Sequence, residues 1–175
     1  MNMNSKKKGN RYERSVAKWF TDWSGYKFER NRAGSGAWWT NKDASSDITC
    51  TDEKHAHRCK ISIECKFYKD IKFEHILFDK KGQSIIKFWS QAVRDSERVG
   101  KVPILCMRYN SMPKGDFFFV IDGILAKAFV KVLSENHITL SIPGYSLLVF
   151  MASKVKKLSS YDDLHREVKK YIKSK

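Results

Sequence analysis

An aspartate at position 47 and a Glu-x-Lys triplet at 64–66 are the residues of this chain whose types and spacing best suit catalysis. Asp47 precedes Glu64 by seventeen residues. Side chains alternate along a strand, so Glu64 and Lys66 project from the same face, and a hairpin would bring Asp47 alongside Glu64. Two carboxylates about 4 Å apart repel by several kcal/mol unless a proton or a cation lies between them.

A divalent cation would relieve this repulsion, and hard oxygen ligands favour Mg²⁺, with Mn²⁺ expected to substitute. The amine of Lys66 would neutralise the negative charge that develops when water attacks a phosphodiester. The residues therefore predict a site for metal-dependent phosphodiester hydrolysis. The alternative is a Glu–Lys pair on a solvated strand face, which contributes little to stability.

The strands that must position these residues follow from hydrophobic alternation. Ile61, Ile63, Cys65 and Phe67 alternate with polar residues, which predicts a strand over 58–68. An antiparallel partner over 47–51 precedes it, and a polar turn over 52–57 joins the two. Because a buried strand carries the triplet and a second strand precedes it in a strongly basic chain, the catalytic interpretation is favoured.

Three segments resemble a known group. Asp47 with Glu64-Cys65-Lys66 is similar to the PD-(D/E)xK nuclease signature. Residues 8–14 (KGNRYER) resemble the first-helix motif of archaeal-type Holliday junction resolvases, which also occur in phages, and residues 32–36 (RAGSG) resemble their loop before the aspartate. The resemblance covers roughly residues 6–110 and implies an α/β, restriction-endonuclease-like fold, in which helices flank a mixed central β-sheet.

The resemblance implies roles residue by residue. It assigns Glu13, Asp47 and Glu64 to catalysis and to the metal, adds the backbone carbonyl of Cys65 as a ligand, and makes Lys66 the catalytic lysine. The chain departs from the pattern in two places. Ser46 stands where a proline is usual, and an extension over 37–43 leaves Asp43 as a competing aspartate. Asp47 is preferred because it opens the strand.

Glu13 has a second interpretation that the sequence leaves open. It lies near the start of a helix predicted over 10–22, where a carboxylate interacts favourably with the helix dipole, by about 0.3–1 kcal/mol. Its position beside the apolar stripe of that helix is compatible with either role.

Basic residues provide candidate DNA contacts outside the metal site. In the helix predicted over 84–99, Lys87, Gln91, Arg94 and Arg98 form one polar stripe, which is either a solvated face or a DNA-binding one. In related nuclease folds this helix contributes a Lys or Gln near the metals, and Gln91 is the match. The candidate DNA-binding residues are Lys6, Lys7, Lys8, Arg11, Arg14, Arg32, Ser35, Lys87, Gln91 and Arg94.

Two further groups of residues suggest ligands. Trp38 and Trp39 in the glycine-rich loop would stack on unpaired bases, at about 1–3 kcal/mol per base, or cover a partner or the chain's own core. Cys50, His55, His57 and Cys59 suggest zinc, but their spacing matches no usual zinc module. They are predicted to be turn residues and small apolar fillers.

The composition sets the class of partner. The chain has 175 residues, 42% of them hydrophobic, and a net charge of +15 with a pI near 9.7. The charge is concentrated in residues 1–36 and 151–175 and indicates a nucleic acid partner, the alternative being a merely soluble basic protein. Apolar runs are too short for a membrane span, and four unpaired-looking cysteines favour a cytoplasmic compartment, including the host cytoplasm if the protein comes from a phage.

The domain organisation follows from these patterns. Residues 1–9 are predicted to be a flexible basic arm and residues 10–175 a single nuclease domain, with its core over about 10–122 and C-terminal strands and a helix over about 123–175. The remaining predicted elements are strands over 26–30, 102–108, 116–121, 137–142 and 145–151, a short helix over 123–133 and a terminal helix over 161–172.

The residues and the resemblance together predict a Mg²⁺-dependent, structure-selective DNA endonuclease, most specifically one that resolves four-way junctions. The resemblance also implies products with 5′-phosphate ends. Because a four-way junction has approximate two-fold symmetry, a homodimer is expected on branched double-stranded DNA. One alternative is another PD-(D/E)xK nuclease that acts on linear, flap or single-stranded DNA. The other is a catalytically inactive nucleic-acid-binding module.

Overall fold

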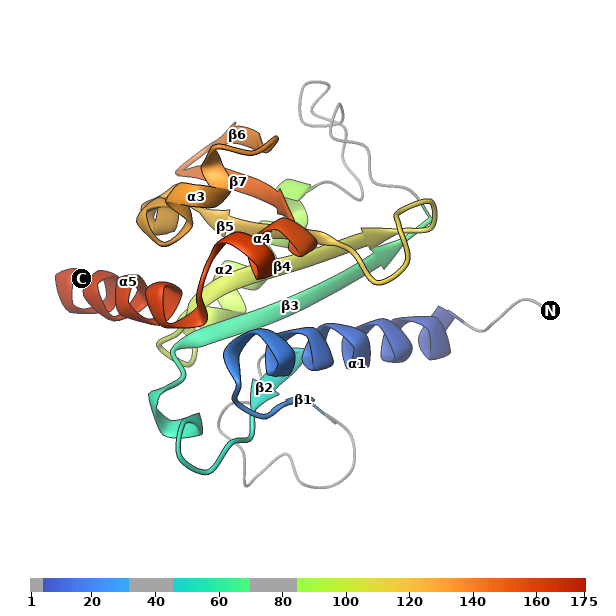
Figure 1. Cartoon of the computed structure of the whole chain (residues 1–175), viewed down its shortest axis with the longest axis horizontal. Helices are drawn as coiled ribbons and strands as arrows, with labels where there is room; N and C mark the ends of the chain where they lie inside the picture. The colour runs from blue at the N-terminus through green and yellow to red at the C-terminus, as the bar shows by residue number, and fades with distance from the viewer. Residues whose placement is uncertain (1–4, 32–45, 70–84) are drawn as a thin grey trace.

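A seven-stranded mixed sheet forms the centre of the molecule (Figure 1). The computed structural model describes residues 5–31, 46–69 and 85–175. The strand order is β1-β2-β3-β4-β5-β7-β6, with β3 and β4 parallel and all other neighbours antiparallel. The strands are β1 (Phe28–Arg30), β2 (Ile48–Cys50), β3 (Ile61–Tyr68), β4 (Val102–Tyr109), β5 (Phe118–Asp122), β6 (Ile138–Ile142) and β7 (Tyr145–Met151). The predicted α/β fold class is confirmed.

Helices cover both faces of the sheet (Figure 1). They are α1 (Ser5–Ser24), α2 (Ile85–Glu97), α3 (Val130–Leu133), α4 (Ala152–Leu158) and α5 (Tyr161–Ser174), with 3₁₀ helices η1 (Ala56–Arg58) and η3 (Gly123–Phe129). Within the described residues, no helix is both long enough and apolar enough to cross a bilayer.

The parallel pair β3–β4 is buried on both sides. Ile63, Ile104 and Leu105 are completely inaccessible to solvent, as expected for a central strand pair covered by helices on both faces. Ile63 is directly opposite Ile104, and Glu64 is opposite Leu105. A residue on β3 therefore has a fixed direction, because a shift of one residue would place the apolar set on the wrong face.

One face of the sheet packs against α1, η3 and α5. Val16, Phe20 and Leu164 belong to this core and are fully buried. The helical spacing of apolar residues in α1 determines which side packs inward, and Gly25 ends the helix with a positive φ of 76° while its N–H donates to the Thr21 carbonyl. The opposite face packs against α2, whose Phe88 and Trp89 contact the second core with Leu105 and Met107.

The start of α1 differs from the prediction. The helix begins at Ser5, so residues 5–9 of the predicted flexible arm are helical, and residues 1–4 lie outside the described residues. Lys8 explains part of the difference, because its Nζ lies 4.1 Å from the centre of the Phe67 ring and donates to Oδ1 of Asn110. A contact with a residue so distant in sequence stabilises a helical turn that local propensity does not predict.

The C-terminal third contains one helix that the sequence did not predict. Helix α4 has seven residues and follows β7 directly. It is too short to produce a periodic signal, and it is held by burial of Ala152 and Val155 and by a hydrogen bond from the Ala152 N–H to the Phe117 carbonyl. The hairpin β6–β7 and the terminal helix are confirmed. Ser160 caps α5 by accepting a hydrogen bond from the Asp163 N–H over 3.1 Å.

Candidate active site

Asp47 lies at the point where β2 begins, beside β3. Its N–H donates to the Ile63 carbonyl over 3.1 Å, and its own carbonyl accepts from the N–H of Asn31 over 2.8 Å. Its side-chain Oδ2 accepts from the Cys65 N–H over 2.8 Å. Backbone and carboxylate are therefore both fixed to neighbouring strands, as the predicted hairpin requires.

Glu64 and Lys66 project from the opposite face of β3 to Ile63 and Cys65. The Lys66 Nζ donates to Oε1 of Glu64 over 2.6 Å, and only 5% of Glu64 is exposed. Gln91 of α2 joins this pair: its Nε2 donates to the same Glu64 oxygen over 2.9 Å and its Oε1 accepts from Lys66 over 3.0 Å. The structure thus brings Glu64, Lys66 and Gln91 into direct contact.

The electrostatics of the two carboxylates reflect their shared burial. Burial first, and the charge of Asp47 second, raise the pKa of Glu64 to about 7, although Lys66 opposes the shift. Burial also raises the pKa of Asp47, and the charge of Glu13 adds to that rise, while the Cys65 N–H opposes it. Burial lowers the pKa of Lys66, but the hydrogen bond and charge of Glu64 outweigh burial, so that the net shift is upward and the amine stays protonated.

Glu13 lies on α1 and is ion-paired with Arg30 of β1. Arg30 also donates from Nη2 to Oδ1 of Asn10 over 2.9 Å. The charge of Glu13 nevertheless acts on Asp47. The sequence did not indicate Arg30 as a partner of Glu13, because the position of Arg30 at the end of a predicted strand says nothing about its contact with α1.

The carboxylate oxygens of Asp47 and Glu64 are donor atoms that suit a hard divalent cation. Asp47 and Glu64 are neighbouring carboxylates, of which Glu64 is buried and Asp47 half-buried, and the charge of Asp47 raises the pKa of Glu64. A cation relieves the repulsion in such a pair. In the described part of the chain, no group of three His, Cys, Asp or Glu side chains is already arranged to hold a metal. A metal there would thus rely on two carboxylates plus groups such as the Cys65 carbonyl, whose role stays a prediction.

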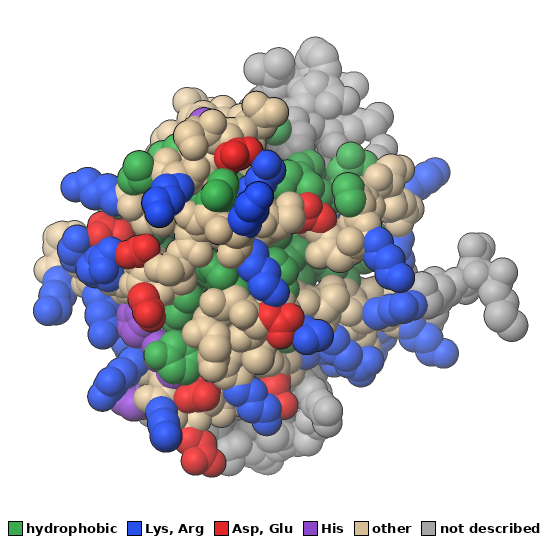
Figure 2. All heavy atoms as spheres, in the orientation of Figure 1, with side chains coloured by type: hydrophobic (Ala, Val, Ile, Leu, Met, Phe, Trp, Pro, Cys, Tyr) green, Lys and Arg blue, Asp and Glu red, His purple; other side chains and the backbone are tan. Residues whose placement is uncertain are grey.

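The remaining predicted site residues are distributed around this centre. Six of the predicted DNA-binding residues are exposed on two helices. On α1 they are Lys6, Lys7, Arg11 and Arg14, and on α2 they are Lys87 and Arg94. Arg32, Ser35, Trp38, Trp39 and the competing Asp43 lie outside the described residues. Figure 2 shows Lys and Arg side chains gathered near the start of α1 and again near α5.

The cysteine and histidine residues between β2 and β3 have structural partners. His55 stacks on Tyr26, with ring centres 3.8 Å apart, and its Nε2 is 2.9 Å from the hydroxyl of Tyr161. His57 is exposed, and Cys59 is buried with the Tyr161 hydroxyl 3.6 Å from its Sγ. These contacts agree with the prediction that the group packs the turn.

A mixed sheet flanked by helices, with an aspartate at the start of one strand and Glu-x-Lys on the next, is the arrangement of a PD-(D/E)xK nuclease. Residues 4–165 match the model of the family described as "Phage putative PDDEXK endonuclease", and the chain belongs to that family. The chain is also similar to Protein D14 of Escherichia phage T5, with 25% identity over 165 residues, which are 94% of this chain and 99% of that protein. No solved structure matches. Nucleases of this class generally use divalent metals.

Proposed function

We propose that this protein is a Mg²⁺-dependent endonuclease that hydrolyses phosphodiester bonds in branched DNA, with four-way junctions as its main substrate. The observation that supports hydrolysis is the contact among Glu64, Lys66 and Gln91 beside the fixed carboxylate of Asp47. A surface ion pair does not require burial of the acid, a second partner for the amine, or a neighbouring carboxylate.

Each side chain has a defined part in the proposed reaction. When bound, a divalent cation supplies Lewis acidity that polarises a phosphate oxygen and lowers the pKa of water. Asp47 and Glu64 are the side chains that would hold it. Lys66 remains protonated and is held by Glu64 and Gln91, so its positive charge can stabilise the negative charge that develops on the phosphate during attack.

The charge of the chain supports a DNA substrate, and the segments that resemble those of junction resolvases support a branched one. The net charge of +15 suits a polyanion with several phosphate contacts. The segments at 8–14 and 32–36 are similar to those of junction resolvases. A homodimer would place two such sites on a two-fold symmetric junction, and sedimentation of the free protein and of its junction complex tests that part of the proposal.

The decisive experiment is cleavage of a synthetic four-way junction beside flap, single-stranded and linear duplex DNAs of the same sequence. We expect paired nicks in the junction with Mg²⁺ or Mn²⁺ and none with EDTA. If linear, flap or single-stranded DNA were cleaved faster than the junction, that DNA would be the preferred substrate. Binding without metal-dependent cleavage of any of these DNAs would identify an inactive DNA-binding module.

A further inference from the structure

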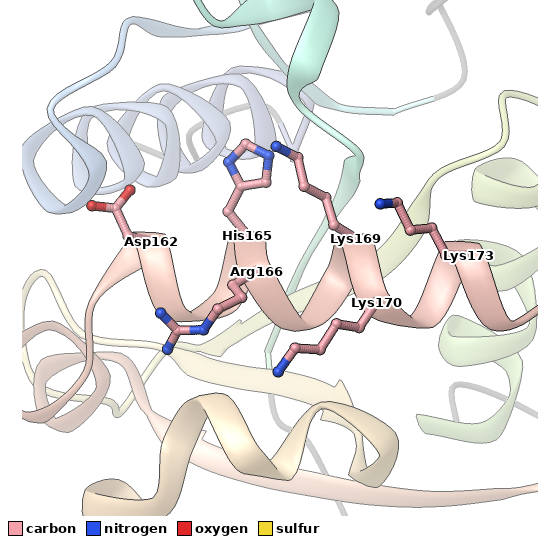
Figure 3. Close-up of a pocket in the computed structure, with 6 residues that line it drawn as sticks. All are labelled: Asp162, His165, Arg166, Lys169, Lys170 and Lys173. Carbon is pink, nitrogen blue, oxygen red and sulfur yellow. The ribbon is translucent and has the colours of Figure 1, made fainter.

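Helix α5 and the elements beside it carry a group of exposed lysines that the active site does not use. The group, here called the C-terminal basic surface, consists of Lys127 of η3, Lys131 of α3, Lys157 of α4, and Lys169 and Lys173 of α5. Figure 3 shows His165 and Lys169 on one side of α5, and Arg166 and Lys170 on the other. Cationic side chains therefore project from both sides of this helix.

Two hollows lie within this surface. One of about 350 Å³ follows α5 and is lined by Asp162, His165, Arg166, Lys169, Lys170 and Lys173. The other, of about 390 Å³, lies where the start of α5 meets η3, α3 and α4. Its charged lining residues are Lys127, Lys131, Lys157 and Asp163, and Asp163 is paired with Arg166. Three lysines thus face one concave region, which is a geometry that suits a phosphate group with several charged oxygens.

Several exposed lysines outside this surface are neutralised by ion pairs. Lys18, Lys27 and Lys154 each form an ion pair, at 3.1, 3.2 and 2.6 Å. Across the parts of the chain that the structure describes, no member of the C-terminal basic surface is in an ion pair. Of the neighbouring cations, Arg166 pairs with Asp163 and Lys170 with Glu167.

The spacing of the lysines adds to their repulsion. Lys169 and Lys173 are four residues apart on α5, so they are neighbours on its surface. Like charges at this spacing destabilise a helix, and their repulsion decreases when a polyanion binds. An arrangement that costs stability in the free protein but favours a bound polyanion is typical of a nucleic acid contact.

The place of this surface in the fold indicates which part of the DNA it contacts. Leu164 and Val168 pack α5 against the same face of the sheet as α1. Gln91 lies on α2, which covers the opposite face, and it contacts Glu64 and Lys66 from that side. The amine of Lys66 and the lysines of α5 therefore belong to opposite sides of the sheet.

From these observations we infer that the C-terminal basic surface binds the phosphate backbone of a duplex arm other than the one that is cut. This inference rests on the proposed function in one respect, because it takes the substrate to be branched DNA. It assigns a binding role to the C-terminal part of the chain, in which α5, α4 and η3 act together.

The test compares two variants with the same loss of charge. Lys127→Gln, Lys157→Gln and Lys169→Gln are combined in one protein; Lys18→Gln, Lys27→Gln and Lys114→Gln, which are outside the surface, are combined in the control. Binding to a four-way junction, and to a linear duplex as long as one arm, is measured in EDTA over a range of salt concentrations. Cleavage of the junction at saturating DNA is measured separately with Mg²⁺.

We expect the slope of log K against log salt on the junction to decrease in magnitude by up to ~2.7 in the surface variant, since each lost phosphate contact contributes ~0.9. The control should keep most of the original slope, and the change on the linear duplex should be smaller. Cleavage at saturating DNA should stay within about twofold of the original rate, because the active site is intact. A slope that does not change, or changes equally in the control, would overturn the inference, as would an equal change on both DNAs.

The two proposals fail in different ways. If the original protein cleaves no DNA but the surface variant shows the expected slope change, the proposed function is wrong and the binding surface stands. If the protein cleaves junctions and the slope is unchanged, the surface is wrong and the proposed function stands.

Discussion

Gln91 donates a hydrogen bond from its amide nitrogen to Oε1 of Glu64 over 2.9 Å, although the two residues lie 27 positions apart on different elements. The same amide accepts from Lys66. Helix α2 thereby fixes the orientation of an acid and an amine that both belong to β3. The contact links the packing of α2 on the sheet to the geometry of the proposed reaction.

Replacing Gln91 with Ala should lower cleavage by about 10- to 100-fold, because partners that orient a catalytic group typically contribute this much. The melting temperature should change little, since the side chain belongs to neither apolar core. Ser90→Ala is the matched control, because Ser90 is the exposed neighbour on the same helix. Unchanged cleavage by the Gln91 variant would show that Lys66 and Glu64 keep their geometry without it.

Replacing Lys66 with Ala should reduce cleavage by at least about 100-fold, since it removes the charge that stabilises the developing phosphate anion. Junction binding measured in EDTA should be retained, because the binding surface holds many other cations. Lys60→Ala, at an exposed position just before β3, is the control. If both variants cleaved at the original rate, Lys66 would have only a structural role.

Glu13 offers a test of whether the ion pair with Arg30 coexists with a metal contact. Glu13→Gln keeps a polar partner for Arg30 but removes the charge that acts on Asp47. If Glu13 contributes to the metal site, the variant should need a higher Mg²⁺ concentration for half-maximal cleavage. A Mg²⁺ titration measures this, with Glu29→Gln on β1 as a control, and an identical titration curve would restrict Glu13 to its pair with Arg30.

The pH dependence of folding should report on His55. Burial lowers its pKa from 6.5, although Asp52 and Asp162 oppose the shift and Lys169 and Arg58 add to it. Below pH 6.5 the unfolded chain then binds more protons at this residue than the folded chain does. The stability contribution of neutral His55 is therefore complete above pH 6.5 and is lost as the pH falls through the lower folded-state value.

The variant His55→Phe keeps an aromatic ring against Tyr26 but cannot titrate. We expect its free energy of unfolding, measured with urea, to decrease less between about pH 7 and about pH 5 than that of the original protein. His165, whose ring centre is 4.8 Å from that of His55, also has a lowered pKa. It still contributes to the pH dependence of the free energy of unfolding in the variant. Equal losses in the two proteins would mean that His55 titrates alike in the folded and unfolded chains.

Much of the fold follows from alternation and periodicity in the sequence. The alternating apolar residues of β3 predicted that Glu64 and Lys66 share a face, because alternation is local spacing that a sequence displays directly. The polar stripe of α2 was equally compatible with a solvated face, and Gln91 was expected near the site only from the resemblance to related nucleases. The predicted start of α1 was wrong, because contacts of Lys8 with Phe67 and Asn110 stabilise the first turns of the helix and both partners are distant in sequence. The pairing of Glu13 with Arg30 was missed for the same reason.

The double attachment of Asp47 has a consequence for how relatives of this protein can diverge. Because its backbone is bonded to Ile63 on one side and to Asn31 on the other, its register does not depend on the number of residues between 31 and 46. Insertions and deletions in that interval can therefore accumulate in evolution, or be introduced by engineering, while the acid keeps its place.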